Sequence, residues 1–213
     1  MTNFADMIDG YHRFRNTGWA EQRDRWDELR DGQSPKVMVI ACSDSRVDPA
    51  QIFDTNPGEV FVVRNVAALV PPFETTPGLH GVSAALEFAV QVLKVGEIVV
   101  MGHGRCGGCQ AALTQELKDA PPGEGGFVAH WIEMLDEARD KVRATYGPDD
   151  HSREALRAME KEGVKVSLAN LRTFPCIQEK EQAGTIQLVG AYFAISDGIL
   201  HILDEEHGEF APA

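Results

Sequence analysis

Two short motifs, each placed just after an apolar run, constrain the fold of this 213-residue chain more than any other feature. Residues 36–41 (KVMVIA) precede the motif at 42–46 (CSDSR), and residues 97–101 (EIVVM) precede the motif at 103–108 (HGRCGG). Both runs are short and rich in β-branched residues, which is typical of parallel strands buried on both faces. Because functional groups in open α/β sheets gather at the carboxyl ends of strands, we expect the two motifs to meet there.

The two motifs offer three metal ligands and one ion pair, namely Cys42, His103 and Cys106, and Asp44 with Arg46. Two thiols and an imidazole suit tetrahedral zinc, and three protein ligands leave a fourth position for water, as at catalytic zinc sites. An exposed ion pair contributes little by itself. Asp44 and Arg46 follow a ligand closely at the end of a strand, which favours a role beside the metal.

The remaining periodicities predict an α/β fold with a mostly parallel central sheet flanked by helices, an N-terminal helical extension and a C-terminal hairpin. Apolar residues recur at helical spacing from Phe4 to Phe14, so residues 1–31 are expected to form the extension. Asp197-Gly198 is a hairpin signal between two strand-like runs. The other expected segments are strands at 36–41, 59–64, 97–101, 185–195 and 199–203, and helices at 49–54, 79–93, from Cys106, at 127–145 and at 152–173.

Composition limits the class of protein. A 213-residue chain with 43% hydrophobic residues can form one domain over 1–213. The net charge of -13 argues against nucleic acid as a partner. No apolar run approaches the roughly 20 residues of a membrane span, and the N-terminus lacks the pattern of a secretory signal, so we expect no membrane partner. Four cysteines fit a reducing compartment, and we expect the cytoplasm.

The motifs also allow other interpretations, which compete with a catalytic zinc site. Gly102-x-Gly104-x-x-Gly107 matches a dinucleotide fingerprint, but a Pro/Gly-rich break replaces the acidic strand end that should follow. The H-x-E and P-C-x-x-C pair of zinc deaminases is absent. Cys109 lies one helical turn after Cys106, so a closed structural site with four ligands is the non-enzymatic alternative. We interpret Cys109 and Cys176 as structural by default, and we regard His80 as a candidate proton carrier.

These residues resemble the β-class carbonic anhydrases. The likeness continues through residues 33–36 (QSPK), 57–59 (PGE), 63–65 (VRN) and 86–90 (LEFAV), and it is dense from 33 to 110. The resemblance implies a zinc lyase, carbonate dehydratase, that converts carbon dioxide reversibly to bicarbonate and a proton. It implies one Zn²⁺ per chain on Cys42, His103 and Cys106, with zinc-bound hydroxide attacking the carbon. Asp44, kept ionised by Arg46, would orient that hydroxide.

The resemblance also implies a substrate pocket shared between subunits. Its residues would be Gln33, which donates an amide hydrogen bond, an apolar wall of Phe61, Val66 and Phe88, and the backbone of Gly107. Many relatives carry Tyr at the position of Phe88. Residues 1–31 would embrace a partner, so the minimal assembly is expected to be a homodimer, with a tetramer or larger assembly left open. Activity on carbon disulfide or carbonyl sulfide, which some relatives have, is also left open.

The charge of the zinc ligands and the residue at position 39 predict how activity should depend on pH. Two thiolates neutralise the charge of zinc, so its water should be less acidified than the pKa of about 7 found with three imidazoles. Activity should therefore rise on the alkaline side of neutrality. In one subgroup of the family, Asp44's counterpart closes the metal site, and that subgroup carries Trp three residues before the first Cys. Val39 stands there in this chain, which resembles the open subgroup.

Overall fold

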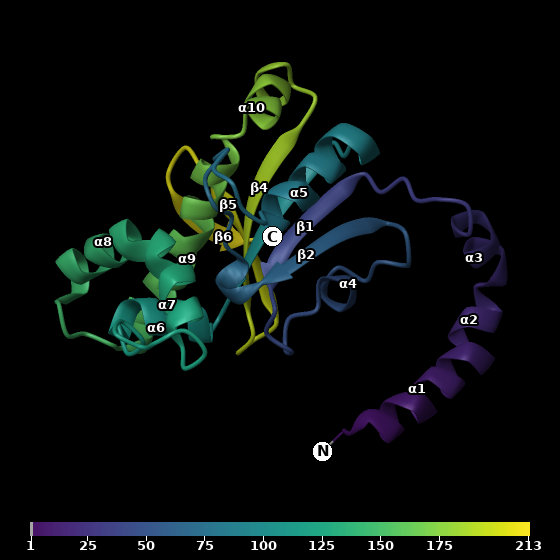
Figure 1. Cartoon of the computed structure of the whole chain (residues 1–213), viewed down its shortest axis with the longest axis horizontal. Helices are drawn as coiled ribbons and strands as arrows, with labels where there is room; N and C mark the ends of the chain where they lie inside the picture. The colour runs from purple at the N-terminus through teal and green to yellow at the C-terminus, as the bar shows by residue number, and fades with distance from the viewer. Residues whose placement is uncertain (1) are drawn as a thin grey trace. The chain divides into compact units, whose positions relative to one another are not determined.

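The computed structural model describes residues 2–213, which divide into two units, one ending at Ser34 and one running from Pro35 to Ala213. Figure 1 shows the helices and strands of both units along the chain. Each unit is compact, because its residues mostly contact other residues of the same unit. The second unit contains both motifs.

The N-terminal unit consists of three helices: α1 (Phe4–Asn16), α2 (Gly18–Glu21) and α3 (Arg23–Leu29). A capping box starts α1, because the Asn3 side chain accepts from the Asp6 amide while the Asp6 carboxylate accepts from the Asn3 amide. Phe14 meets Trp26 edge to face at 6.0 Å between ring centroids, which joins α1 to α3. The predicted helical extension, residues 1–31, is confirmed from residue 2 onward, and Met1 lies outside the described residues. Its apolar residues are largely exposed, with Phe4 at 74%.

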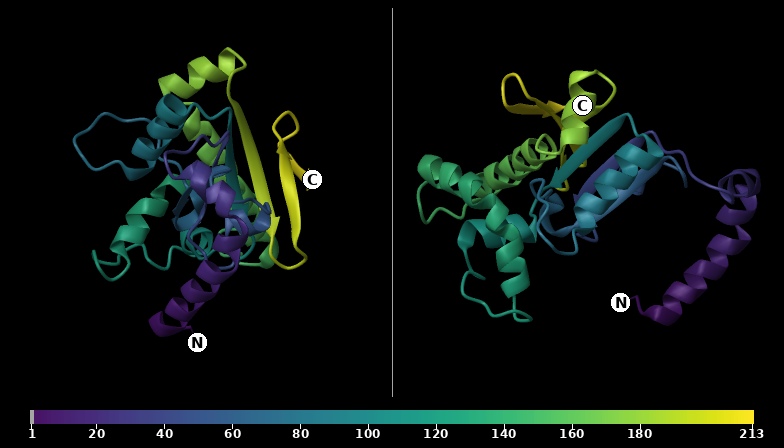
Figure 2. Two further views of the ribbon diagram at one scale, coloured as in Figure 1. Left: turned by 90° about the vertical axis from the view of Figure 1, so that its right-hand side faces the viewer. Right: turned by 45° about the horizontal axis from the view of Figure 1, so that its top comes forward.

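The second unit is built on a six-stranded sheet in the order β2-β1-β3-β4-β5-β6. Its strands are β1 (Val37–Cys42), β2 (Val60–Asn65), β3 (Glu97–His103), β4 (Gln187–Ala194), β5 (Ile199–Asp204) and β6 (Glu209–Pro212). The first four are parallel, whereas β5 and β6 are antiparallel and lie at the edge beyond β4 (Figure 2). The predicted fold class is confirmed, including the hairpin at Asp197-Gly198.

Helices and short turns connect the strands. They are α4 (Pro49–Ile52), η1 (Val66–Ala68), α5 (Gly81–Glu87), η2 (Phe88–Leu93), α6 (Gly107–Thr114), α7 (Gly126–Ile132), η3 (Glu133–Leu135), α8 (Asp136–Tyr146), α9 (Arg153–Leu171) and α10 (Pro175–Gln182). The helix expected at 127–145 is divided by the 3-10 turn η3. Among residues 2–213, no helix has both the length and the apolar character of a membrane span.

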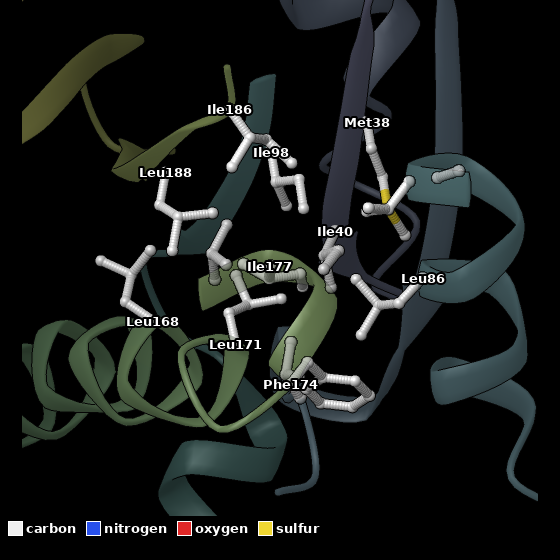
Figure 3. Close-up of a cluster of buried hydrophobic side chains, with 14 of the residues drawn as sticks. Met38, Ile40, Leu86, Ile98, Leu168, Leu171, Phe174, Ile177, Ile186 and Leu188 are labelled. Atoms are coloured by element: carbon white, nitrogen blue, oxygen red, sulfur yellow. The ribbon is translucent and has the colours of Figure 1, made fainter. Parts of the chain in front are cut away.

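The core explains why the strands are continuously apolar. Met38 and Ile40 point to one face of the sheet and pack with α5, α9 and α10, as Figure 3 shows. Val39 and Ala41 point to the other face and are equally buried. A strand buried on both faces needs apolar residues at every position, which is the pattern that the sequence shows.

Helix α9 lies unusually close to the sheet. A Cβ added at Gly102 of β3 would stand 2.7 Å from a methyl carbon of Val164, and one at Gly190 of β4 would stand 2.9 Å from Leu168. Only glycine therefore permits this approach. The close packing brings the buried face of α9 against the carboxyl end of β3, where the second motif begins.

Candidate metal centre

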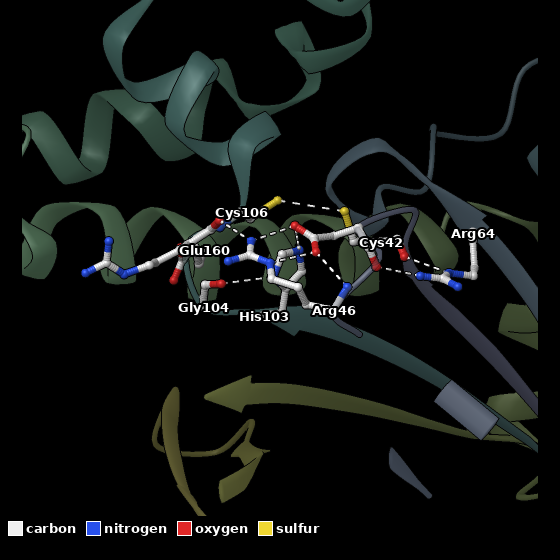
Figure 4. A network of polar contacts seen from close by, with 9 residues as sticks. Cys42, Arg46, Arg64, His103, Gly104, Cys106 and Glu160 are labelled. Atoms are coloured by element: carbon white, nitrogen blue, oxygen red, sulfur yellow. Dashed lines mark hydrogen bonds and ion pairs between the residues drawn. The ribbon is translucent and has the colours of Figure 1, made fainter. Parts of the chain in front are cut away.

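The sheet brings the three predicted ligands together. Cys42 ends β1, His103 ends the neighbouring strand β3, and Cys106 is the N-cap of α6. Their ligand atoms all lie within 4.8 Å of one another, and the two sulfur atoms are 4.0 Å apart (Figure 4). Two sulfur ligands on one tetrahedral zinc are roughly 3.8 Å apart, so the spacing fits one metal ion. The prediction that the two motifs meet at the sheet edge is confirmed.

The orientation of His103 supports the same conclusion. Its Nδ1 lies 3.0 Å from the carbonyl oxygen of Gly104, which can only accept, so Nδ1 carries the proton. The other ring nitrogen, Nε2, is buried and has no hydrogen-bond partner. A bare, buried imidazole nitrogen beside two thiols is the donor set that zinc takes. The residues therefore fit the metal that the sequence predicts.

Without a metal the two thiols are held in their protonated form. The hydrogen bond with Cys106, together with burial, raises the pKa of Cys42 to about 12. The neighbouring thiol of Cys109, again with burial, raises the pKa of Cys106. Zinc binds thiolates, so its entry must release these protons.

Asp44 and Arg46 form a two-point ion pair next to the ligands. Arg46 donates from Nη2 to Asp44 Oδ2 at 2.7 Å and from Nε to Oδ1 at 2.9 Å, and its backbone amide donates to Oδ1 at 3.0 Å. These bonds hold the pKa of the Asp44 carboxyl well below its usual range. Asp44 Oδ2 lies 4.0 Å from His103 Nε2 but outside the three-ligand group. An ionised acceptor thus lies beside the predicted metal position.

Arg64 holds the first motif from the next strand, a role that the sequence did not reveal. Its guanidinium donates to the carbonyl of Cys42 at 2.9 Å, to the carbonyl of Asp44 at 2.6 Å and to the carboxylate of Asp48 at 3.1 Å. The three acceptors lie between the last residue of β1, Cys42, and the N-cap of α4, Asp48. Arg64 therefore fixes the backbone that carries Cys42 and Asp44.

Glu160 of α9 supports the second motif from 54 residues away. One carboxylate oxygen accepts from the Cys106 amide at 3.0 Å, and the other accepts from the Tyr192 hydroxyl at 2.8 Å. The residue is 3% exposed, and burial raises the pKa of its carboxyl. A signal existed in the sequence, because helical spacing from Gly163 and Val164 places Glu160 on the apolar face of α9.

We expect Glu160→Leu to lower zinc affinity by about 10- to 100-fold, the usual cost of losing a group that orients a metal ligand. Glu160→Gln, which keeps an acceptor for the Cys106 amide, should lose less. Competition with a chromophoric chelator measures both. Glu162→Gln is the matched control, since Glu162 pairs with Lys165 away from Cys106. Wild-type zinc affinity in Glu160→Leu would exclude the supporting role.

The structure joins the predicted substrate residues in two separate places. Phe61 and Phe88 stack with ring centroids 5.8 Å apart, but Phe61 lies opposite Met38, roughly 13 Å along the sheet from the end of β1. Val66 lies at the start of α6, because a Cβ on Gly108 would stand 2.8 Å from its Cγ1. Gly107, the first residue of α6, is exposed. Only Val66 and Gly107 are thus placed beside the motif of Cys106.

The structure places the four remaining candidate residues, Gln33, His80, Cys109 and Cys176, outside the three-ligand group. Gln33 lies in the N-terminal unit and is exposed, so its part in the pocket stays a prediction. His80 contacts Thr76 and Glu74 of its own loop, and its proton-carrying role also stays a prediction. Cys109 is buried and faces Gly163 of α9, outside the ligand group, while Cys176 is half-buried.

Comparison with known proteins decides the family. The family model described as carbonic anhydrase matches residues 37–200, which include both motifs. The chain belongs to the carbonic anhydrase family. A carbonic anhydrase from Pseudomonas aeruginosa is 38% identical over 201 residues, covering 93% of this chain and 87% of the relative.

Solved structures agree with this membership. The β-carbonic anhydrase CcaA superposes with a TM-score of 0.90 at 29% identity, covering 99% of this chain and 92% of the other. A tetrameric β-carbonic anhydrase from Sordaria macrospora superposes at 0.82 with 27% identity, covering 94% and 96%. The chain is therefore of the β-class, and the class consists of zinc enzymes that hydrate carbon dioxide. In this chain, the cluster that fits the zinc ion consists of Cys42, His103 and Cys106.

Proposed function

We propose that this chain hydrates carbon dioxide reversibly to bicarbonate and a proton, with Asp44 orienting the attacking oxygen. One observation carries the proposal. An ionised carboxylate, tied at two points to Arg46, lies 4.0 Å from the bare ring nitrogen of His103 without joining the three-ligand group. This arrangement supports three metal ligands with a separate acceptor beside them.

The residues divide the chemistry between them. Cys42, His103 and Cys106 would hold zinc, which supplies Lewis acidity and a water of lowered pKa as nucleophile. The Asp44 carboxylate can only accept hydrogen bonds, so it would accept one from the O–H of the attacking oxygen and thereby turn a lone pair of that oxygen toward carbon dioxide. Arg46 is the positioning residue, because its guanidinium also donates to the carbonyl of Arg105 at 3.0 Å and so links both motifs.

The substrate wall and the assembly belong to the same proposal. Val66 and Phe88 are 37% and 42% exposed in the single chain. Their exposure supports an apolar wall of Phe61, Val66 and Phe88 whose two separate parts meet across a subunit interface, with the backbone of Gly107 and with Gln33. The exposed apolar residues of α1 support a single domain over 1–213 whose extension, residues 1–31, packs on another subunit. We propose a homodimer or a larger assembly, and a cytoplasmic location because all four cysteines are unpaired.

We expect turnover to rise from pH 7 to pH 9 along a single ionisation. The lowered pKa of Asp44 keeps that carboxylate charged throughout this range, so its own titration, which lies at much more acidic pH, does not shape the profile. Val39, three residues before Cys42 where the closing subgroup carries Trp, further predicts no closure by bicarbonate. Initial rates across this range, with and without added bicarbonate, measure both effects. A loss below pH 8 steeper than one proton per site and strengthened by bicarbonate would contradict the open site.

A further inference from the structure

A second cavity lies behind the loop of the second motif and has no part in the proposed reaction. It has a volume of about 430 Å³ and is bounded by the start of α9, by α6 and by the end of β4. Gly104 and Arg105 line it, but none of the three predicted metal ligands does. The cavity is therefore distinct from the space that the ligand atoms surround.

Positive charge gathers at this cavity. The side chains of Arg105, Arg153 and Arg157 line it and are exposed. Within residues 2–213, no carboxylate lies within ion-pair distance of these three guanidinium groups, although the chain as a whole carries a net charge of -13. Arg157 interacts with the Tyr192 hydroxyl and with the more distant charge of Glu160, whereas Arg105 and Arg153 have no such carboxylate among the described residues. The cluster therefore offers charge that is available to a ligand.

The one carboxylate that lines the cavity offsets at most one of these three charges. Glu160 is buried, and its two oxygens already accept from the Cys106 amide and the Tyr192 hydroxyl. Three guanidinium groups thus face at most one negative charge, which leaves a surplus of at least two positive charges. The 19-residue helix α9 also begins here at Ser152, and its N-terminal dipole adds to the positive potential.

Part of the lining is apolar. Leu113 and Leu156 line the cavity, and Ala194 and Ile195 close it from the end of β4. An inorganic ion would use the guanidinium groups but leave this surface in contact with water. A ligand with both an anionic and an apolar part would use both.

We propose that this cavity binds a phosphate monoester that carries a compact apolar group. Arginine binds phosphate and carboxylate oxygens with paired hydrogen bonds, and the surplus of two charges matches a phosphate dianion better than a monocarboxylate. Arg153 and Arg157, one helical turn apart on α9, hold the phosphate, and the apolar group lies against Leu113 and Leu156.

Titration calorimetry of the zinc-loaded full chain with phenyl phosphate tests the proposal. We expect one saturable site per chain, with inorganic phosphate and benzoate each binding at least tenfold more weakly. Arg153→Gln and Arg157→Gln should each weaken phenyl phosphate by about tenfold, through the loss of charged hydrogen bonds, while zinc content stays unchanged. Lys141→Gln with Lys180→Gln removes two charges on α8 and α10, one more than either arginine variant, and should bind as the wild type does.

Two results would overturn the site. Absence of saturable binding to the wild-type chain is the first. The second is unchanged affinity in both arginine variants, which would place the phenyl phosphate elsewhere, at the metal centre included. An equal loss in the paired lysine control would show general attraction by surface charge and would contradict the site as well.

Discussion

Replacing Cys42, His103 or Cys106 singly with alanine should remove zinc and reduce carbon dioxide hydration to the uncatalysed background. Each residue supplies one of only three protein ligands, and their ligand atoms lie within 4.8 Å of one another. Loss of any one leaves two donors that cannot hold the ion in a tetrahedral site. Elemental analysis of the purified variants, with stopped-flow hydration on the same samples, measures both losses.

Cys109→Ala is the matched control for these three variants. Cys109 is buried one helical turn beyond Cys106 and contacts that thiol, yet it lies outside the ligand group and faces Gly163. We expect this variant to keep one zinc per chain and most of its activity. Loss of zinc in Cys109→Ala would indicate a closed structural site with four ligands.

Asp44→Asn should keep zinc but lower turnover by on the order of 10², the usual scale for a group that accepts a proton or hydrogen bond in the reaction. Asparagine preserves the shape of the side chain, but it lacks the negative charge that Arg46 stabilises. Zinc content and the rate constant for turnover should therefore separate in this variant, whereas they fall together in the ligand variants.

Asp54→Asn is the corresponding control, since Asp54 is exposed ten residues further along the same loop region and adopts a positive φ of 49° that asparagine tolerates. We expect wild-type turnover there. Undiminished hydration by Asp44→Asn would remove Asp44 from the mechanism. Loss of zinc from that variant would instead make Asp44 a ligand.

The metal centre could be predicted from the sequence because short local segments specify the positions of its ligands. Cys42 and His103 each end an apolar run, and the carboxyl ends of neighbouring parallel strands must lie at one edge of a sheet. The hairpin was equally readable from Asp197-Gly198, which the antiparallel pairing of β4 with β5 confirms. The ion pair of Asp44 and Arg46 was also visible in the motif, and resemblance to a known family added the role of Asp44 in orienting the hydroxide.

The contacts of the supporting residues could not be predicted, since they depend on tertiary packing, although helical spacing places Glu160 on the apolar face of α9. Glu160 reaches Cys106 only because Gly102 and Gly190 let α9 approach the sheet closely. The division of the helix at 127–145 also escaped prediction, because a 3-10 turn such as η3 changes the backbone without interrupting the apolar pattern.

Two other elements, β6 and α10, were not predicted because their residues form no periodic apolar pattern. Strand β6 is four residues long, lies at the sheet edge and is mostly exposed, so it shows no alternation of apolar and polar residues. Helix α10 buries only Ile177, which leaves no periodic apolar face to detect. Predictions about a partner subunit, such as the role of Gln33, concern contacts that one chain does not contain.

Stopped-flow hydration of carbon dioxide, measured with a pH indicator while zinc is removed and restored, tests the central claim most directly. The purified chain should hydrate carbon dioxide in proportion to its zinc content. Activity should disappear when a chelator removes the metal, and it should return in full with one equivalent of zinc per chain. Hydration at only the uncatalysed rate by a folded chain that holds one zinc on Cys42, His103 and Cys106 would contradict the account.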